Sequence, residues 1–360
     1  PAAPETPLIN NPKVYGATPG AEFIWSVIAT GRRPITYGAE GLPEGLVIDK
    51  NTGVISGKAL RAGDYKVTLT AVNDLGKDKS EVTVKIGDRI SLTPIMGWSR
   101  WNCWRFDASD EILRRTTDIM HEKLHPYGWT YVSVDDGWEA ADRRADGVLP
   151  GNANWPDMKS LTGYMHSKGM KFGIYSSPGP TTCGNFLASY KHEYIDAQTW
   201  ADWGVDYLKY DYCSHTQVEK DSSEGSIRAP YDLMREALDR TGRDIVYCVG
   251  YGAPRVWIWG PDAGGNHWRT TCDITDRWNV VQAIGNCQDV CAPATAPGRF
   301  NDPDMMVVGE VGGGWGAPKH PTLLTPDEQY AHVSLWAILS APLLLGCDME
   351  RLDDFTLSLL

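Results

Sequence analysis

Two segments of the chain each place a cation and a carboxylate at alternate positions. In Val205–Asp211, Lys209 and Asp211 alternate with Leu208 and Tyr210, so the two charged side chains fall on one side of a predicted strand. A cation beside a carboxyl group lowers its pKa and favours the ionised form that a nucleophile needs. A buried ion pair with only a structural role is the alternative.

The second segment, His267–Asp273, places Arg269, Thr271 and Asp273 on one face of another predicted strand by the same alternation. Two carboxylates from different strands match the requirement of glycoside hydrolysis for one acid and one nucleophile or base. Asp276 is an alternative acid, but it lies beyond the predicted strand, where capping of the next helix is the more typical role.

A third acidic group, Asp135 and Asp136, ends a further predicted strand. Adjacent carboxylates repel each other unless cations or hydroxyl donors engage them, and sugar hydroxyls would do so. A divalent metal is the weaker alternative because histidine is missing from these strand ends. We therefore expect a carbohydrate site without a metal ion. For Asn301–Asp304, after another strand, a turn with a helix cap fits at least as well as a catalytic role.

The elements that must position these acids alternate between strands and helices from about residue 92, which indicates parallel strands joined by crossover helices. We predict a (β/α)8 barrel over residues 89–360, whose catalytic groups lie at the C-terminal ends of its strands. That position favours a catalytic role for Asp211 over a structural ion pair. Strands should end near Trp98, Asp135, Tyr175, Asp211, Val249, Asp273, Met306 and Gly346, with helices at Asp110–His125, Ser160–Lys168, Ala197–Trp203 and Ala229–Thr241.

Residues 1–88 have a different pattern, with short runs of Val, Ile and Thr separated by turns that contain Gly and Pro. We predict a small Ig-like β-sandwich in this part of the chain, with a turn at Asn51-Thr52-Gly53. Its strands are expected at Glu22–Ile28, Val47–Asp49, Val54–Ser56, Asp64–Val72 and Lys79–Ile86.

The eight cysteines have neither the density of a disulfide scaffold nor the two-residue spacing of a zinc or redox motif. Cys183 and Cys213 follow neighbouring predicted strands, so a disulfide across the rim of the site is one expectation. A bridge between Cys287 and Cys291, within one loop, is a second. The remaining four are expected to be small buried residues: Cys103, Cys248, Cys272 and Cys347.

Composition narrows the class of partner. The formal charge of −12 and the pI near 5.1 disfavour nucleic acid and anionic membranes. The longest apolar run, Val333–Cys347, is too short to span a bilayer and contains Pro342, so no membrane insertion is expected. Fifteen Trp and sixteen Tyr against six Phe suit a surface that contacts sugar rings, although most of these Trp are expected in the core. The oligomeric state stays open.

Seven phrases of the barrel segment resemble glycoside hydrolase family 27, the family of α-galactosidases and α-N-acetylgalactosaminidases. They run in family order from residue 93 to 348: TPIMGWSRW, YVSVDDGW, HSKGMKFGIYS, DAQTWADWGVDYLKYDYC, NHWRTTCDI, NDPDMMVVG and LWAILSAPLLLGCD. In the first segment, ITYGAEGLPEGLVIDKNTGVISGKALRAGDYKVTLTA resembles the Ig-like repeats often joined to bacterial surface and secreted enzymes.

The resemblance implies a retaining exo-hydrolase that releases terminal α-galactose without a metal or organic cofactor. Asp211 would be the nucleophile and Asp273 the acid/base. The remaining implied site residues are Asp135 and Asp136 on the galactose 4- and 6-hydroxyls, Lys209 and Arg269 as further polar contacts, Trp101 against the apolar face of the sugar, Tyr175 in the pocket wall, and a disulfide between Cys183 and Cys213.

Two departures from the family pattern keep alternatives open. Gly250 stands where galactose-specific members usually carry the Glu that reads the sugar 2-position, and the chain stops at Leu360, before the family's usual C-terminal antiparallel β-domain. An α-N-acetylgalactosaminidase and a β-L-arabinopyranosidase are alternatives within the same chemistry, and a non-catalytic glycan-binding protein is one from another class. The predicted cysteine pair, the Ig-like partner and the lack of an Asn-x-Ser/Thr sequon favour a periplasmic or secreted bacterial protein.

Overall fold

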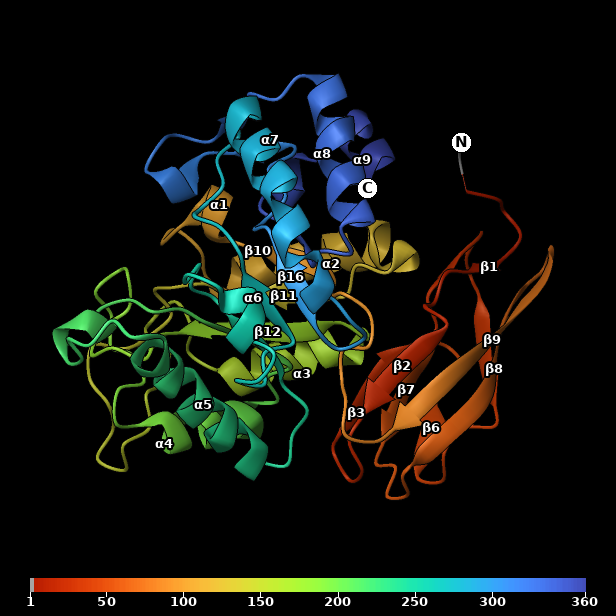
Figure 1. Ribbon diagram of the computed structural model, residues 1–360. Helices are drawn as coiled ribbons and strands as arrows, with labels where there is room; N and C mark the ends of the chain where they lie inside the picture. Colours follow the sequence, from red (N-terminus) through yellow and green to blue (C-terminus); the bar gives the residue numbers. More distant parts are fainter. Residues whose placement is uncertain (1–2) are drawn as a thin grey trace.

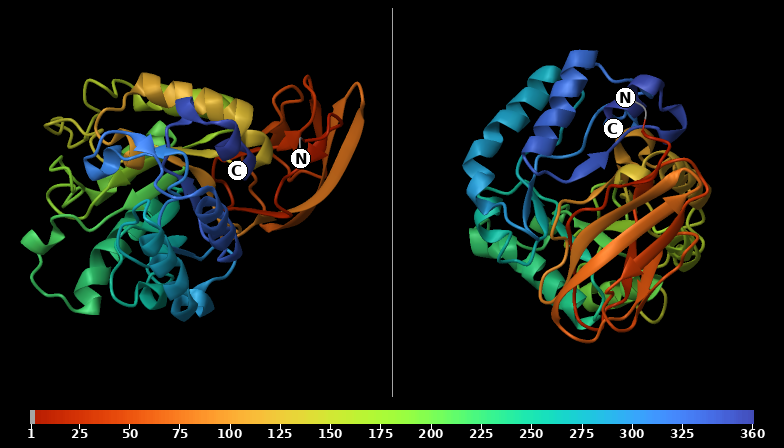
Figure 2. Two further views of the ribbon diagram at one scale, coloured as in Figure 1. Left: turned by 90° about the horizontal axis from the view of Figure 1, so that it is seen from above. Right: turned by 90° about the vertical axis from the view of Figure 1, so that its right-hand side faces the viewer.

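The computed structural model describes residues 3–360, which form an all-β unit followed by an α/β barrel (Figure 1). The last strand of the β unit ends at Ile86 and the first strand of the barrel begins at Met96. In the left view of Figure 2 the β unit lies at one end of the barrel, and in the right view, seen from that end, it lies in front of it. The predicted two-part architecture is confirmed.

The barrel is a ring of eight parallel strands in the spatial order β16-β15-β14-β13-β12-β11-β10-β19. The ring closes through a single bridge between Met306, which follows β16, and Leu345 of β19. The strands are β10 (Met96–Ser99), β11 (Tyr131–Ser133), β12 (Lys171–Ser176), β13 (Tyr207–Tyr210), β14 (Val246–Val249), β15 (His267–Arg269), β16 (Phe300–Asp302) and β19 (Leu343–Leu345).

Alternation along the strands divides the barrel core into two layers. On β13, Leu208 and Tyr210 pack among the residues between strands and helices, whereas Tyr207 packs inside the ring with Tyr131 and Leu344. Lys209 lies between Leu208 and Tyr210 in the sequence, so its side chain points into the ring, near the C-terminal end of β13. The chain that follows β13 emerges at the C-terminal end of the barrel, where the site was predicted.

Several helices begin or end at recognisable capping residues. Ser109 accepts a hydrogen bond from Ile112 N at the start of α2, and Thr325 and Glu328 form a capping box at the start of α8. Gly204, at φ +91°, ends α4 in the left-handed conformation. The helices are α1 (Trp101–Trp104), α2 (Asp110–Lys123), α3 (Met158–Ser167), α4 (Glu193–Trp203), α5 (Glu224–Arg240), α6 (Val256–Trp259), α7 (Trp278–Asn286), α8 (Pro326–Ile338) and α9 (Asp354–Leu359).

The β unit is a sandwich of a four-stranded sheet, in the order β2-β9-β8-β5, and a three-stranded sheet, β3-β7-β6. Alternate residues Val67, Leu69 and Ala71 of β8 are fully buried in its core. The predicted turn before β7 contains Gly53 at φ +75°. The strands are β1 (Leu8–Ile9), β2 (Val14–Ala17), β3 (Phe23–Ser26), β4 (Ala29–Thr30), β5 (Thr36–Glu40), β6 (Leu46–Ile48), β7 (Val54–Gly57), β8 (Gly63–Asn73) and β9 (Gly76–Ile86); β1, β2, β4 and β5 had no counterpart in the sequence prediction.

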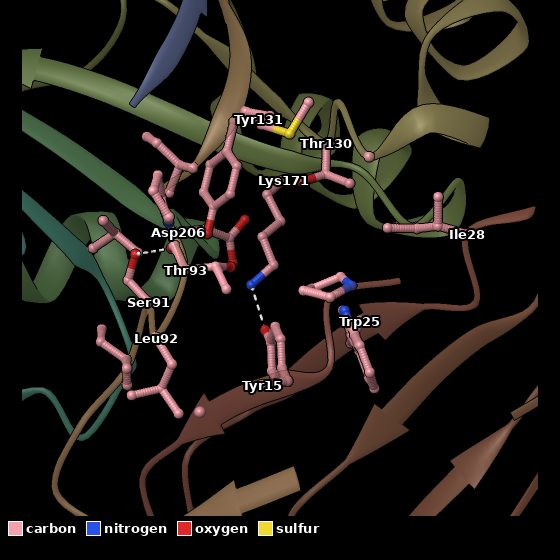
Figure 3. Close-up of a pocket in the computed structure, with 18 of the residues that line it drawn as sticks. Tyr15, Trp25, Ile28, Ser91, Leu92, Thr93, Thr130, Tyr131, Lys171 and Asp206 are labelled. Carbon is pink, nitrogen blue, oxygen red and sulfur yellow. Dashed lines mark hydrogen bonds between the residues drawn. The ribbon is translucent and has the colours of Figure 1, made fainter. Parts of the chain in front are cut away.

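The sandwich covers the N-terminal ends of the barrel strands, away from the predicted site. Lys171, the first residue of β12, donates a hydrogen bond of 2.8 Å to the hydroxyl of Tyr15, beside Trp25 (Figure 3). These residues line a cavity of about 410 Å³ between the two units. Ser26 Oγ also lies 2.8 Å from Nε2 of the buried His125. The contact is therefore a packed interface with polar anchors.

Among residues 3–360, no helix combines the length and the hydropathy needed to cross a membrane.

Candidate active site

The sequence-predicted site residues gather at the C-terminal ends of four barrel strands. Asp135 and Asp136 follow β11, Tyr175 lies on β12, Asp211 directly follows β13, and Asp273 comes four residues after the end of β15. Because parallel strands end on one face of the ring, these side chains from distant parts of the sequence meet at one site.

Asp211 is held by hydrogen bonds on both carboxyl oxygens. Oδ2 accepts from the hydroxyl of Tyr175 at 3.0 Å and Oδ1 accepts from the backbone N of Tyr212 at 2.9 Å. Burial raises the pKa of Asp211, while the charges of Lys209 and Arg269 and these hydrogen bonds oppose the rise. The expectation of a lowered pKa is therefore wrong, because burial outweighs the neighbouring cations. The contacts still favour the carboxylate form that a nucleophile requires.

Asp273 reaches the site from a loop. Strand β15 ends at Arg269, so the prediction that a continuous strand aligns Arg269, Thr271 and Asp273 is wrong. Instead, Nη2 of Arg269 lies 3.0 Å from Oδ1 of Asp273 and 3.0 Å from Oδ2 of Asp304. Asp304 in turn accepts a 2.8 Å hydrogen bond from Ile274 N, which anchors the loop next to Asp273.

The two candidate catalytic acids lie beside the same two cations. Lys209 and Arg269 act to lower the pKa of both Asp211 and Asp273. Desolvation raises the pKa of Asp273, but the charge and hydrogen bond of Arg269 together with the charge of Lys209 outweigh it, and the net shift is downward. The side chain of Asp273 is 88% exposed, so it faces the open mouth of the site rather than the barrel core. One half-buried carboxyl group, that of Asp211, and one accessible carboxyl group, that of Asp273, thus share a single positively charged wall.

Asp135 and Asp136 differ in their partners. Oδ2 of Asp135 lies 3.0 Å from Lys209 Nζ and accepts a 3.2 Å hydrogen bond from Ser99 Oγ. Oδ2 of Asp136 accepts from Gly184 N at 2.6 Å, whereas its buried Oδ1 has no hydrogen-bond partner. Burial raises the pKa of Asp136 to about 6. An unpaired buried acceptor beside a site is costly, and a ligand hydroxyl would satisfy it.

Sequence reasoning missed the cation beneath these two acids. Arg100 is buried and donates hydrogen bonds to the backbone carbonyls of Asp135 and Asp136. It thereby fixes the loop that carries both carboxyl groups. The sequence shows only that an Arg follows the strand residues GWS. It does not show the partners of this Arg, which lie 35 and 36 residues away in the chain.

A disulfide between Cys183 and Cys213 joins two loops of the rim, with their Cα atoms 5.1 Å apart. Cys213 is two residues from Asp211, and Cys183 precedes Gly184, the donor to Asp136. The prediction of this bridge is confirmed. The alternative bridge is wrong, since Cys287 and Cys291 are both free. Cys272 is also free, and it is exposed where a buried residue was expected.

Aromatic side chains complete the wall. Tyr175 is only 1% exposed, and its ring lies under Lys209 Nζ at 5.3 Å. Trp101, the first residue of α1, is partly exposed and meets Phe106 edge to face at 5.5 Å. Its open surface is available to an apolar sugar face.

Asp276 does not cap the next helix, contrary to prediction. Helix α7 has no side-chain cap, and Oδ2 of Asp276 accepts a hydrogen bond of 2.9 Å from Leu323 N. Asp276 is 4% exposed, so its role is to hold two loops together. It takes no part in the site beside Asp273.

Two groups of possible metal ligands lie at the site among residues 3–360. The first is Cys183, Asp211 and Cys213, in which both sulfur atoms are already joined in a disulfide. The second, beneath the site, is Cys248, His267 and Asp302, all buried. Nδ1 of His267 lies 2.8 Å from Oδ2 of Asp302, so this carboxylate is already engaged. Lys209 and Arg269 line the small cavity next to the group. Because these two fixed cations lie beside the group, they oppose the binding of a metal cation there.

Comparison with known proteins gives two family matches. Residues 93–360 match the family described as "Alpha galactosidase A", and residues 6–87 match the one described as "Putative Ig domain".

Alpha-galactosidase 2 of Arabidopsis thaliana is 36% identical over 307 residues, which cover 84% of this chain and 72% of that protein. The alpha-galactosidase of Cyamopsis tetragonoloba is 38% identical over 274 residues, which cover 74% of this chain but only 62% of that protein. A solved structure from Bacteroides fragilis, titled a "putative alpha-galactosidase", is 36% identical with a TM-score of 0.92 and covers 98% of this chain and 76% of that one.

Proposed function

This chain belongs to the Alpha galactosidase A family of glycosidases, and we propose that it removes terminal α-linked galactose from oligosaccharides, polysaccharides or glycoconjugates with retention of configuration. The observation that carries this proposal is the pairing of Asp211 and Asp273 on one cationic wall formed by Lys209 and Arg269. A half-buried carboxylate that can attack and an accessible carboxyl group that can donate a proton are the two groups that double displacement needs.

Binding of the sugar would use the acids after β11. The unpaired Oδ1 of Asp136 can accept a hydrogen bond from a galactose hydroxyl, and Asp135 presents a carboxylate already oriented by Lys209. Trp101 would cover the apolar face of the ring. Each of these contacts positions the anomeric carbon against Asp211 before any bond breaks.

In the first step, a carboxylate oxygen of Asp211 attacks the anomeric carbon while Asp273, which must first take up a proton against the lowering effect of Arg269 on its pKa, donates that proton to the glycosidic oxygen. The bond to the leaving group breaks and a glycosyl ester forms on Asp211. In the second step, Asp273, now ionised, takes a proton from water, and the water oxygen displaces Asp211. Two inversions at one carbon give net retention.

The test uses Asp211→Asn and Asp273→Asn with an aryl α-galactoside, and proton NMR to follow the first anomer released. We expect Asp211→Asn to lose at least about a thousandfold in kcat/KM, and wild-type enzyme to release α-galactose first. Asp232→Asn, on the exposed surface of α5, is the matched control and should retain full turnover. Near-normal turnover by Asp211→Asn, or initial release of the β-anomer, would overturn the proposal.

The second candidate substrate is an α-N-acetylgalactosaminide, because Gly250 offers no side chain to the sugar 2-position. A Cβ at this position would lie 2.9 Å from the carbonyl oxygen of Tyr210, so the backbone itself leaves no room for the usual acid. A β-L-arabinopyranoside lacks the 6-hydroxyl that would satisfy Asp136, which disfavours it. Relative kcat/KM on aryl glycosides of the three sugars decides among them. Binding of galactose without any turnover would instead support a glycan-binding protein.

We propose further that the protein is exported to the periplasm or the exterior of a bacterium. The disulfide beside the site and the joined Ig-like sandwich support an oxidising compartment. Cell fractionation followed by thiol labelling of Cys183 and Cys213 tests this location. Labelling of both cysteines in the native protein would contradict it.

A further inference from the structure

Three tyrosine rings form a nearly parallel stack from the core to the rim of the site. The ring centroids of Tyr231 and Tyr212 are 6.2 Å apart with an interplanar angle of 16°. Those of Tyr212 and Tyr251 are 4.7 Å apart at 14°. Tyr231 is fully buried, whereas 36% of Tyr251 is exposed. The stack therefore presents one open aromatic ring on a rigid base.

The base of the stack is tied to the catalytic chain segment. The hydroxyl of Tyr231, on α5, donates a 3.1 Å hydrogen bond to the backbone carbonyl of Asp211. Tyr212 is the next residue after Asp211, and its backbone N donates to the carboxylate of Asp211. These contacts tie Tyr231 and Tyr212 to Asp211. The ring of Tyr251, which packs on Tyr212, is therefore held in a defined position relative to Asp211.

Tyr251 stands between the two catalytic acids on the rim. It follows β14, and β14 lies between β13, which ends next to Asp211, and β15, whose loop carries Asp273. A Cβ added to Gly252 would lie 2.6 Å from the carbonyl oxygen of Thr271, so the segment after Tyr251 packs directly on the loop of Asp273.

The glycine that replaces the expected acid helps to place this ring. The backbone N of Gly250 donates to the carbonyl of Tyr210 at 2.7 Å, which draws the chain after β14 close to β13. Because a side chain at 250 would meet that same carbonyl, the first side chain free to project from this loop is that of Tyr251.

We propose that Tyr251 is the platform for the sugar ring of the leaving group, so that the preferred substrate is an α-galactosyl oligosaccharide whose second residue is a pyranose. This inference rests on the proposed function, because the general acid must lie at the glycosidic oxygen. The leaving group then extends past Asp273 towards the rim, where Tyr251 is the exposed flat surface. A ring already held by two others loses little conformational entropy when a sugar stacks on it.

The alternative is that Tyr251 only packs its own loop. The two roles differ in their dependence on the leaving group. We would compare Tyr251→Ala with the matched control Tyr251→Phe on two substrates: α-galactosyl fluoride, whose leaving group has no ring, and galactosyl-α-1,6-glucose, whose leaving group is a pyranose. The Phe variant keeps the ring and removes only the hydroxyl.

For Tyr251→Ala we expect kcat/KM on the disaccharide to fall about tenfold, with the value for the fluoride within about twofold of wild type. Tyr251→Phe should retain both activities. An equal loss on both substrates, or no loss on the disaccharide, would overturn the platform. Failure of the wild-type enzyme to hydrolyse the fluoride would instead count against the proposed function, so the two failures are distinguishable.

Discussion

Lys209 Nζ lies 3.0 Å from Oδ2 of Asp135, so a side chain of β13 reaches past β12 to the acid that follows β11. Lys209 also lowers the pKa of Asp211, against the larger effect of burial. A single cation thus joins the predicted sugar-binding acid to the predicted nucleophile. The alternation in the sequence had paired Lys209 only with Asp211.

Replacement of this cation should shift the pH dependence of hydrolysis. In Lys209→Met, the pKa of Asp211 rises further because the charge that opposes the effect of burial most strongly is gone, so ionisation requires a higher pH. The acidic limb of kcat/KM should move upward and the maximum should fall by about a hundredfold. The measurement is a pH profile with α-galactosyl fluoride. Lys209→Arg keeps the charge and should keep the limb nearer its wild-type position; an unmoved limb in the Met variant would contradict this role.

Asp136 should make the unliganded protein less stable at neutral pH. Its folded pKa of about 6 lies above the ordinary value of 3.8, so the folded state holds the proton more tightly. Stability therefore falls as pH rises through the interval between these values. Asp136→Asn removes that effect, which amounts to about 3 kcal/mol at pH 7. It should raise Tm at pH 7, have little effect at pH 4, and weaken substrate binding.

Asp135→Asn is the matched comparison for this stability experiment. Asp135 partners Lys209, which is half-buried, so replacement of Asp135 leaves the charge of Lys209 unpaired and should lower Tm at pH 7. Thermal denaturation of both variants without sugar would therefore show opposite shifts. A fall in Tm for Asp136→Asn at pH 7 would contradict the prediction that the ionised carboxylate of Asp136 destabilises the unliganded protein.

The interface between sandwich and barrel should weaken in acid. Burial lowers the pKa of His125 to about 3 from its ordinary 6.5, and its Nε2 lies against Ser26 of the sandwich. The stability that neutral His125 contributes is fully present above pH 6.5 and is lost as pH falls towards 3. In His125→Gln, Tm should be lower at pH 7 and should depend less on pH between 6.5 and 4. An undiminished slope in differential scanning calorimetry would exclude His125 as the source.

Local alternation predicted part of the site correctly and failed where the strand ended early. Lys209 and Asp211 are two residues apart on or next to one strand, and both face the site as expected. Arg269 and Asp273 are brought together as well, but by an ion pair across a loop. Alternation cannot show where a ladder of backbone hydrogen bonds stops, because that depends on the neighbouring strand.

The remaining errors concern burial and long-range partners. The rise in the pKa of Asp211 comes from desolvation, which the sequence of one strand does not reveal. Cys287 and Cys291 looked like a loop pair, yet they lie on a 3₁₀ helix, where Cys287 Sγ is 3.1 Å from the carbonyl of Ile284. The contacts of Arg100 and Asp304 with the catalytic loops likewise exist only in the folded chain.

The disulfide should matter to catalysis because of where its two ends lie. Cys213 follows Asp211, the proposed nucleophile, by two residues, and Cys183 precedes Gly184, the donor to Asp136. The bridge therefore fixes the proposed nucleophile against a proposed sugar-binding acid. In the double variant Cys183→Ser with Cys213→Ser, kcat/KM should fall about tenfold, because misplacement of positioned groups is costly. Tm should also fall, since closing a loop of 30 residues stabilises the folded state by about 3.6 kcal/mol. Reductant should reproduce both losses in the wild type and add nothing to the double variant, while Cys287→Ser, which removes a free thiol, should behave as wild type. Wild-type kcat/KM in the double variant would show that the two loops hold their positions without the bridge.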